Sequence, residues 1–232
     1  MTWLSSAYVD PSVHELFPDY RASLIVADHL QPGPSDEVSG KLLADAEARY
    51  QGEDAVEWDG HPHLAAWRAA FRALGAKPQR FRPSVDALLR RVPAGLPRIN
   101  RLTDVYNAVS IAHVLPIGGE DVTAYRGPLR LVRATGEEEF DTVAAGEPAT
   151  EHPEPGEIVW RDDLGITCRR WNWRQCVRTR LTEETTHGVF ILDALGAMPD
   201  ADLAAATAAM VDVLRATSPD ADITTRTLNE AD

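Results

Sequence analysis

The segment 168–174 holds the densest group of side chains that could do chemistry, because it interleaves arginine with tryptophan. Arginine can hold phosphate groups and tryptophan can stack on a base, so the segment suits binding of a nucleic-acid end. The alternative is structural. Trp171 and Trp173 lie two residues apart, so in a strand they would share one face of a sheet. The arginines would then face solvent or pair with glutamate. The sequence leaves both interpretations open.

Metal, cofactor and thiol chemistry have little support. Cys168 and Cys176 are eight residues apart, and His61 and His63 flank a proline. A structural zinc site needs four ligands, usually in close pairs. Cys168 sits in an apolar alternation typical of a core, and no base for a catalytic thiol is identifiable. Phosphate-binding loops, GxSxG elbows, HExxH helices and dinucleotide fingerprints are all missing from the sequence. We therefore expect no metal and no cofactor.

Charge is segregated along a chain whose net charge is −13. Residues 64–101 contain nine Lys/Arg against one acid, and residues 161–180 contain six Arg against two acids. Between these blocks, residues 134–160 contain eight acids and no Lys/Arg. The basic blocks would form a localised anion-binding face on an otherwise acidic molecule. Alternatively, they are solvated helix faces and ion-pair partners of the acids.

Length and composition predict one globular domain spanning residues 1–232. The chain is 44% hydrophobic and 25% charged, which is ordinary globular composition. We expect residues 1–60 to form an N-terminal extension packed on this domain. No stretch approaches the ~18 apolar residues of a membrane span, and no signal peptide is recognisable. Two cysteines suit a reducing cytoplasm, so the expected location is cytoplasmic, with no membrane contact.

Hydrophobic periodicity predicts helices first and strands second, which indicates an α+β fold. A strand is expected at 22–27, ahead of four helices. These helices are expected at 36–50, 64–74, from 83 onward, and 104–114 with Thr103 as N-cap. Period-two segments then predict strands at 129–133, 157–160, 165–168, 177–181 and 188–192. A helix at 201–216 and a closing strand at 223–227 follow, while 147–156 is expected to be an exposed loop.

Several of these segments together resemble a known family. In order they are Lys77–Arg91, Leu96–Asn100, Asp104–Ser110, Leu115–Asp121, Gly156–Val159, Arg169–Arg174 and Thr182–Thr186. Their order and spacing resemble a freestanding B3/B4 domain, the module found inside the β subunit of phenylalanyl-tRNA synthetase. The resemblance covers about residues 64–214. It implies an α+β fold in which a mixed, sandwich-like sheet is covered by helices, and it implies a pocket.

In the synthetase this module is the editing site, which hydrolyses the ester of tRNA carrying the wrong amino acid. The resemblance therefore implies a trans-editing factor whose partner is mischarged tRNA, and it does not identify any protein partners. The polar residue of the first pocket helix corresponds to Asn107, beside Tyr106. Gly118 stands where the synthetase has a histidine, and 171–175 replaces a glycine-rich floor. Asp193 is the acid nearest the side-chain-reading glutamate. These departures suggest that tyrosine is not the substrate amino acid.

Ester hydrolysis needs a positioned water, a stabilised oxyanion and a held substrate. On this interpretation Asn107 orients the water and the backbone N–H groups of Gly118 and Gly119 face the oxyanion. The remaining expected roles are phosphate binding by Arg169, Arg170, Arg174 and Arg178, adenine stacking by Trp171 or Trp173, and substrate contacts from Tyr106, Asn172 and Asp193.

Two other classes remain compatible with the sequence. One is a tRNA- or amino-acid-binding module that does no chemistry, which the missing histidine favours. The other is a structural or interaction protein, in which the arginines would be used in internal ion pairs and the pocket would be closed.

Overall fold

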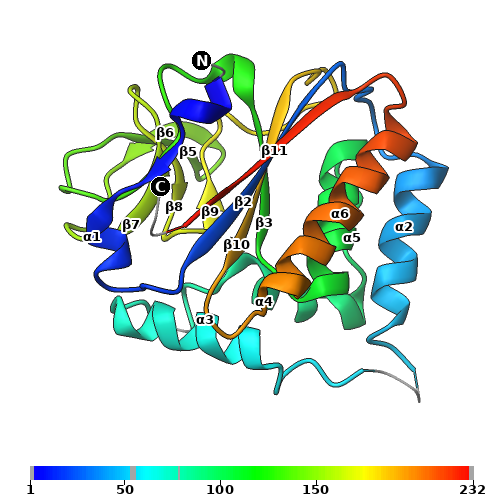
Figure 1. The fold of residues 1–232 in the computed structure, drawn as a ribbon, viewed down its shortest axis with the longest axis horizontal. Helices are drawn as coiled ribbons and strands as arrows, with labels where there is room; N and C mark the ends of the chain where they lie inside the picture. Colours follow the sequence, from blue (N-terminus) through cyan, green and yellow to red (C-terminus); the bar gives the residue numbers. More distant parts are fainter. Residues whose placement is uncertain (1–2, 53–55, 78, 230–232) are drawn as a thin grey trace.

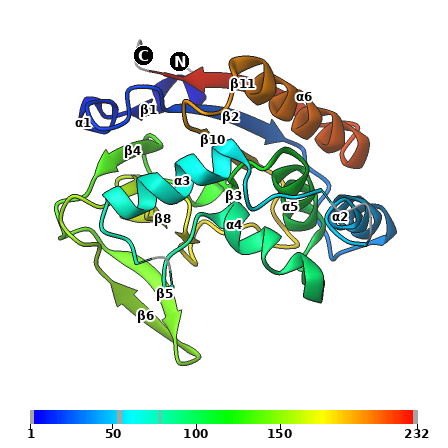
Figure 2. The same ribbon diagram turned by 90° about the horizontal axis from the view of Figure 1, so that it is seen from below.

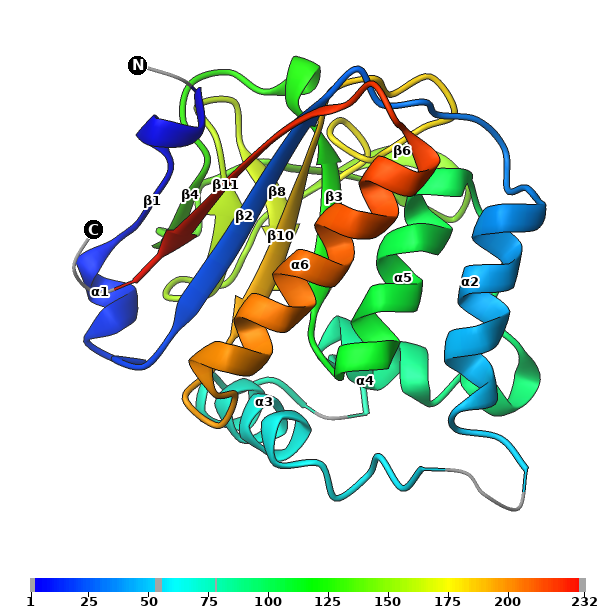
Figure 3. The ribbon, with the colours of Figure 1, turned by 45° about the vertical axis from the view of Figure 1, so that its right-hand side comes forward.

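Two β-sheets face each other across a shared apolar core in the computed structural model, which describes residues 3–52, 56–77 and 79–229 (Figure 1). The core between the sheets takes Leu24 and Ile191 from one sheet and Leu131 and Trp160 from the other. Helices cover the outer face of one sheet and the lower end of the molecule (Figures 1 and 3). The fold is α+β, as the sequence predicts.

The four-stranded sheet has the order β11-β2-β10-β3 and is antiparallel throughout. Its strands are β2 (Arg21–Asp28), β3 (Ile117–Asp121), β10 (Gly188–Ala194) and β11 (Asp222–Leu228). The two central strands, β2 and β10, are mostly buried. That burial explains why their sequences are continuous apolar runs. Because β2 pairs with β10 and β11, the first 60 residues supply a central strand and are not merely an extension packed on the domain.

The second sheet has five strands in the order β1-β4-β7-β8-β9. They are β1 (Tyr8–Val9), β4 (Arg130–Arg133), β7 (Ile158–Arg161), β8 (Ile166–Arg169) and β9 (Arg174–Gln175). β1 runs parallel to β4, and the other neighbours are antiparallel. A separate hairpin joins β5 (Phe140–Ala144) to β6 (Glu147–Glu151). Its second strand occupies part of the segment expected to be an exposed loop.

Six α-helices complete the described part of the chain. They are α1 (Pro11–His14), α2 (Glu37–Ala48), α3 (Pro62–Ala73), α4 (Ser84–Leu89), α5 (Arg101–His113) and α6 (Asp200–Thr217). α5 and α6 pack on the outer face of the four-stranded sheet, and α2 packs on α5 (Figure 3). Seen from below, α3 and α4 lie across the end of the space between the two sheets (Figure 2).

Two local expectations are wrong in detail. α5 starts earlier than expected, because Asn100 and not Thr103 is its N-cap; the Asn100 carboxamide oxygen accepts a hydrogen bond from Thr103 N–H at 2.8 Å. Residues 177–181 form no strand; only Arg180 makes an isolated bridge, opposite Glu120. The strand of this region is the short β9 just before it.

Within the described residues, no helix is both long enough and apolar enough to cross a membrane.

Candidate functional site

A pocket of about 410 Å³ opens where α4 and α5 meet the edges of the two sheets. One wall is the loop before α4 together with α4, and another is the start of the second turn of α5. β3 and β10 supply one side of the floor, and β7, β8 and the turn leading to β9 supply the other. The cavity is therefore an opening at the end of the core that lies between the sheets.

Eight of the twelve residues expected at a site line this single pocket. They are Tyr106, Asn107, Gly118, Trp171, Asn172, Trp173, Arg174 and Asp193. They come from α5, β3, the 170–175 turn and β10, so only the fold brings them together. The other four, which do not line it, are Gly119, Arg169, Arg170 and Arg178.

A tight turn, not a strand, presents the Arg/Trp segment. Arg170 and Trp171 both have left-handed backbone angles, with φ of 46° and 69°. Consequently Trp171 and Trp173 do not share a sheet face. The Trp171 ring is fully buried and packs edge-on against Tyr20 and Trp67, with ring centroids 4.8 and 5.0 Å away. Trp171 is thus a core residue at the base of the pocket and has no free face for stacking on an adenine.

Trp173 lies differently. Its ring is half-buried at the pocket wall and meets Phe81 edge-on at 4.7 Å. The guanidinium of Arg174 lies 5.9 Å from the same ring. Of the two tryptophans expected to stack a base, Trp173 is the one positioned to do so.

Arg169 and Arg170 are held by one buried acid. The Arg169 guanidinium donates to both carboxylate oxygens of Glu157, at 3.0 and 2.9 Å, and to Glu151 at 2.9 Å. Arg170 donates its backbone N–H to Glu157 at 3.1 Å and places its guanidinium 3.5 Å from that carboxylate. The expected phosphate-binding role does not fit these two side chains, because their charges are already paired inside the fold.

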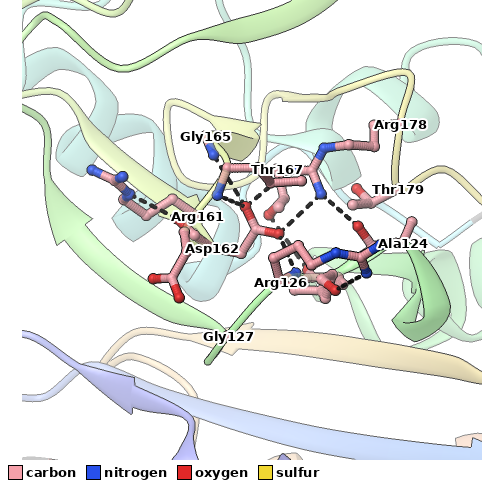
Figure 4. A network of polar contacts seen from close by, with 12 residues as sticks. Ala124, Arg126, Gly127, Arg161, Asp162, Gly165, Thr167, Arg178 and Thr179 are labelled. Carbon is pink, nitrogen blue, oxygen red and sulfur yellow. Dashed lines mark hydrogen bonds and ion pairs between the residues drawn. The ribbon is translucent and has the colours of Figure 1, made fainter.

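Arg178 is engaged in the same way, in the network drawn in Figure 4. Its guanidinium makes two hydrogen bonds of 2.9 Å to the buried carboxylate of Asp162 and one of 2.7 Å to the carbonyl of Ala124. Asp162 also accepts backbone N–H groups from Arg126 and Gly165. Arg178 therefore ties the loop after β9 to the β7–β8 turn, and its expected tRNA contact is not supported.

The accessible positive charge of the pocket comes from the first basic block. Arg80, Arg82 and Arg91 line the pocket around α4, and Arg80 and Arg91 are exposed. Within the described residues neither of these two forms an ion pair. Arg82 has only a distant one, 3.9 Å from Asp86. Arg174 joins them from β9, held loosely at 3.9 Å from Glu151. We call Arg80, Arg82, Arg91 and Arg174 the arginine rim.

Asn107 stands on α5 with its carboxamide at the pocket and 8% of the residue exposed. Among the described residues it has no hydrogen-bond partner. Buried side chains that can hydrogen-bond are nearly always paired, so an unpaired carboxamide at a cavity is available to water or ligand. This arrangement suits the expected water-orienting role.

The ladder between β3 and β10 distinguishes the two glycines. Asp193 N–H donates to Pro116 O and Val122 N–H to His187 O, both at 3.0 Å. In an antiparallel pair of strands, every second pair of opposite residues is hydrogen-bonded. Gly118 and Ile191 form such a pair, so the Gly118 N–H is directed toward β10 and not into the pocket. Gly119 faces the opposite edge, where its carbonyl accepts from Gln175 Nε2 at 3.0 Å. Gly119 does not line the pocket, so the oxyanion role expected of these two amides is not supported by their positions.

Gly118 instead leaves space in the pocket floor, because it has no side chain. A Cβ atom built on it would lie 3.0 Å from Gln175 Nε2, so any side chain would displace this pocket-lining residue. The position where the synthetase module has a histidine is thus part of the open floor.

Asp193 is the centre of a buried polar cluster. Tyr20 donates its hydroxyl to Asp193 Oδ1 at 2.5 Å, and Asn172 Nδ2 lies 3.4 Å from Oδ2. Burial raises the pKa of the Asp193 carboxyl to about 7, against the lowering effect of the Tyr20 and Asn172 hydrogen bonds. The group changes charge near neutral pH and lines the pocket.

Sequence reasoning missed Glu120, which is fully buried and also lines the pocket. Burial raises the pKa of its carboxyl. The sequence signal for this residue is an acid that lies between two apolar residues, Ile117 and Val122. It was hidden because the two glycines before it indicated a turn and not a strand. Three arginines of the rim, Arg80, Arg82 and Arg91, were missed as individuals because only their block was recognised as basic, whereas Arg174 was predicted.

Cys168 also lines the pocket but is unsuited to nucleophilic attack. It is a buried free thiol, and burial raises its pKa well above the usual value. A thiol in this state carries little thiolate at neutral pH. No cluster of three or more His, Cys, Asp or Glu that could hold a metal ion occurs in the described residues.

The family model described as the B3/4 domain matches residues 66–201, which is more than half of the chain. The chain therefore belongs to the B3/4 domain family, as its motifs predict. The matched range contains every residue that lines the pocket.

Among solved structures, an N-terminal fragment of the phenylalanyl-tRNA synthetase β-subunit from Pyrococcus horikoshii is similar, with 12% sequence identity and a TM-score of 0.46. The similarity covers 96% of this chain and 50% of that one, so the chain spans half the length of the fragment. Comparison with curated proteins gave no match.

Proposed function

We propose that this B3/4 domain protein hydrolyses the ester of mischarged aminoacyl-tRNA in trans. The observation that carries the proposal is the pocket itself. An unpaired carboxamide, Asn107, faces a cavity whose rim holds arginines free for phosphate and whose floor is acidic. A closed pocket with all arginines internally paired would have favoured a purely structural role.

The reaction needs no side-chain nucleophile. Asn107 orients a water molecule toward the ester carbonyl, and the water oxygen forms the new bond to carbon. The negative charge that develops on the carbonyl oxygen is stabilised by the positive charge of the arginine rim at the pocket mouth. The bond to the ribose oxygen then breaks, and that oxygen takes the proton released from water, with the adjacent ribose hydroxyl as relay. The products are free amino acid and uncharged tRNA.

The arginine rim holds the terminal phosphates, and Trp173 offers a ring for the terminal adenine. Both lie at the pocket mouth, so the acyl group enters while the tRNA body remains outside. Positioning of this kind supplies much of the rate enhancement available to a site without a strong base.

A deacylation panel tests the proposal. Wild-type protein is incubated with a set of aminoacyl-tRNAs, correctly and incorrectly charged, and release of amino acid is followed over time. We expect acceleration for a subset of mischarged species and none for correctly charged ones. If the protein accelerates hydrolysis of none of the aminoacyl-tRNAs, the proposed deacylase function is wrong.

One observation favours a second candidate, a binding module without chemistry. Gly118 removes the histidine of the synthetase module, and the buried Cys168 offers no substitute. In that case the protein binds aminoacyl-tRNA or its aminoacyl end and protects it or delivers it. Retained binding with no acceleration over the whole panel would identify this function.

A further inference from the structure

Two buried carboxyl groups lie on the pocket side of the four-stranded sheet without a cation. Glu120 of β3 and Asp193 of β10 are 0% and 2% exposed. The register pairs Gly118 with Ile191 and Glu120 with Val189, so both acids project from the face that carries Ile191. The side-chain-free Gly118 lies between them. Among the described residues neither acid makes an ion pair.

Glu120 is only half satisfied. Its Oε2 atom accepts hydrogen bonds from the hydroxyls of Tyr125, at 2.5 Å, and Thr179, at 2.8 Å. Its Oε1 atom is buried and has no partner. Burying a carboxylate oxygen without a hydrogen-bond partner costs free energy. A hydrogen-bond donor on a bound ligand would supply the partner that Glu120 Oε1 lacks within the chain.

Asn172 presents a second unpaired acceptor. Its Nδ2 atom is turned to Asp193, which leaves Oδ1 buried with no partner although the residue lines the pocket and is 7% exposed. The indole N–H groups of Trp160 and Trp171, which both line the pocket, also have no hydrogen-bond partner, although Trp160 lies beside Asp193. The floor thus combines two acidic groups, two acceptors without a partner and two donors without a partner.

We propose that this floor recognises a primary ammonium group of the aminoacyl ligand, held by Glu120 Oε1, Asn172 Oδ1 and the Asp193 carboxylate. An ammonium has three donors and one positive charge, which matches the free acceptors and the uncompensated acids. The neighbouring carbonyl oxygen of the same ligand gives the Trp160 N–H an acceptor. The inference rests on the proposed function for the identity of the ligand but not on catalysis.

Two parts of an aminoacyl group can supply the ammonium: the α-amino group of any residue, or the side chain of a basic residue such as lysine. Amide-linked 3′-aminoacylamino-3′-deoxyadenosines distinguish them, because they cannot be hydrolysed at the ester. The probes are the lysyl compound, its α-N-acetyl derivative, and the norleucyl compound, which lacks only the ε-ammonium. Binding is measured by isothermal titration calorimetry on the whole protein.

We expect tenfold or greater loss of affinity on removal of one ammonium. Loss in the α-N-acetyl derivative assigns the site to the α-amino group, and loss in the norleucyl compound assigns it to a basic side chain. Equal affinity of all three compounds, or no binding of any, would overturn the inference. Binding without deacylation keeps this inference and removes only the deacylase function.

Glu120→Gln provides the residue-level test, since glutamine has nearly the same shape and lacks the charge. We expect the same tenfold loss for the favoured probe and little further loss for the probe that lacks the ammonium. Glu184→Gln, at an exposed position, is the matched control and should bind like wild type. Equal losses for both probes in Glu120→Gln would contradict ammonium recognition. If that variant does not fold, the comparison of probes on wild type decides alone.

Discussion

At the scale of single residues, the site depends on which charges are compensated inside the fold. Arg169 and Arg178 neutralise Glu157 and Asp162, twelve and sixteen residues away in sequence. Asp193 has no such partner, and its carboxyl has a raised pKa of about 7. All three acids are buried, so the presence or absence of an arginine partner decides which of them is compensated inside the fold.

The Asp193 carboxyl gives a pH-dependent stability. Its pKa is about 7 in the folded protein against an ordinary value of 3.8, so the folded state keeps a proton that the unfolded chain loses. The wild-type protein should thus lose stability from this group as pH rises from about 4 to 7. Asp193→Asn removes this loss. We expect its unfolding free energy, relative to wild type, to increase over that range by about 1.4 kcal/mol per unit of pKa difference.

Urea denaturation at several pH values measures this difference. His63 contributes the opposite slope, because burial lowers its pKa to about 4, but it is present in both proteins and cancels. Asp220→Asn makes the same side-chain change at an exposed position and is the control for the effect of the substitution itself. A flat difference for Asp193→Asn would show that its carboxyl titrates normally.

At the scale of elements, α5 and the sheet edge place the site. α5 carries Asn107, and its start is fixed by Asn100, which caps Thr103 N–H and donates to Leu181 O at 3.3 Å. β3 then presents Gly118 and Glu120 to the pocket. The position of the site is thus set by one cap and one strand register.

Asn100→Ala should destabilise the protein by about 1–2 kcal/mol, because it removes the helix cap and leaves the buried Leu181 carbonyl unpaired. Asn100→Asp keeps the capping oxygen and should recover part of that loss. Chemical denaturation of the three proteins checks the order. Equal stability of wild type and Asn100→Ala would show that α5 does not depend on this cap.

Long apolar patterns were predictable from the sequence, and short edge elements were not. The sequence signal is strong for β2 and β10, which are continuous apolar runs, and for α3, which is amphipathic. Each of these elements buries its apolar residues in the core. β3 was hidden by its two glycines, and β5–β6 is a half-exposed hairpin with little apolar alternation. The α5–β3–β10 part of the pocket follows from family motifs, whereas the arginine partners depend on tertiary contacts that composition does not reveal.

At the scale of the whole molecule, the acidic chain presents one local basic area at the pocket mouth. Most arginines of the second basic block are held in internal ion pairs, so at the pocket mouth the arginine rim is the group available to phosphate. A tRNA bound this way has few neutralised phosphates. Binding should be weak, with a logarithmic salt slope of roughly −0.7 to −0.9 per phosphate contacted.

The double variant Arg80→Glu/Arg91→Glu should weaken tRNA binding about tenfold or more and reduce the salt slope without unfolding the protein. Arg178→Ala should instead lower stability and leave tRNA binding nearly unchanged. It should cost about 1–3 kcal/mol of stability, because Asp162 loses its cation, and affect tRNA binding little once folded. Filter binding over a salt series and urea denaturation measure the two effects.

The matched control for the rim is Arg72→Glu/Arg215→Glu, which makes the same charge change at exposed helix positions. Equal weakening by the control would mean that overall charge, and not the rim, governs binding.

In the proposed function, the pocket hydrolyses the ester with a water held by Asn107. Single-turnover deacylation of the best mischarged tRNA, by wild type, Asn107→Ala and the exposed control Gln31→Ala, tests it most directly. We expect a rate at least about a hundredfold lower for Asn107→Ala, with tRNA affinity nearly unchanged, because orienting water matters in the transition state. Gln31→Ala should match wild type. An Asn107→Ala rate equal to that of wild type would show that Asn107 does not orient the water.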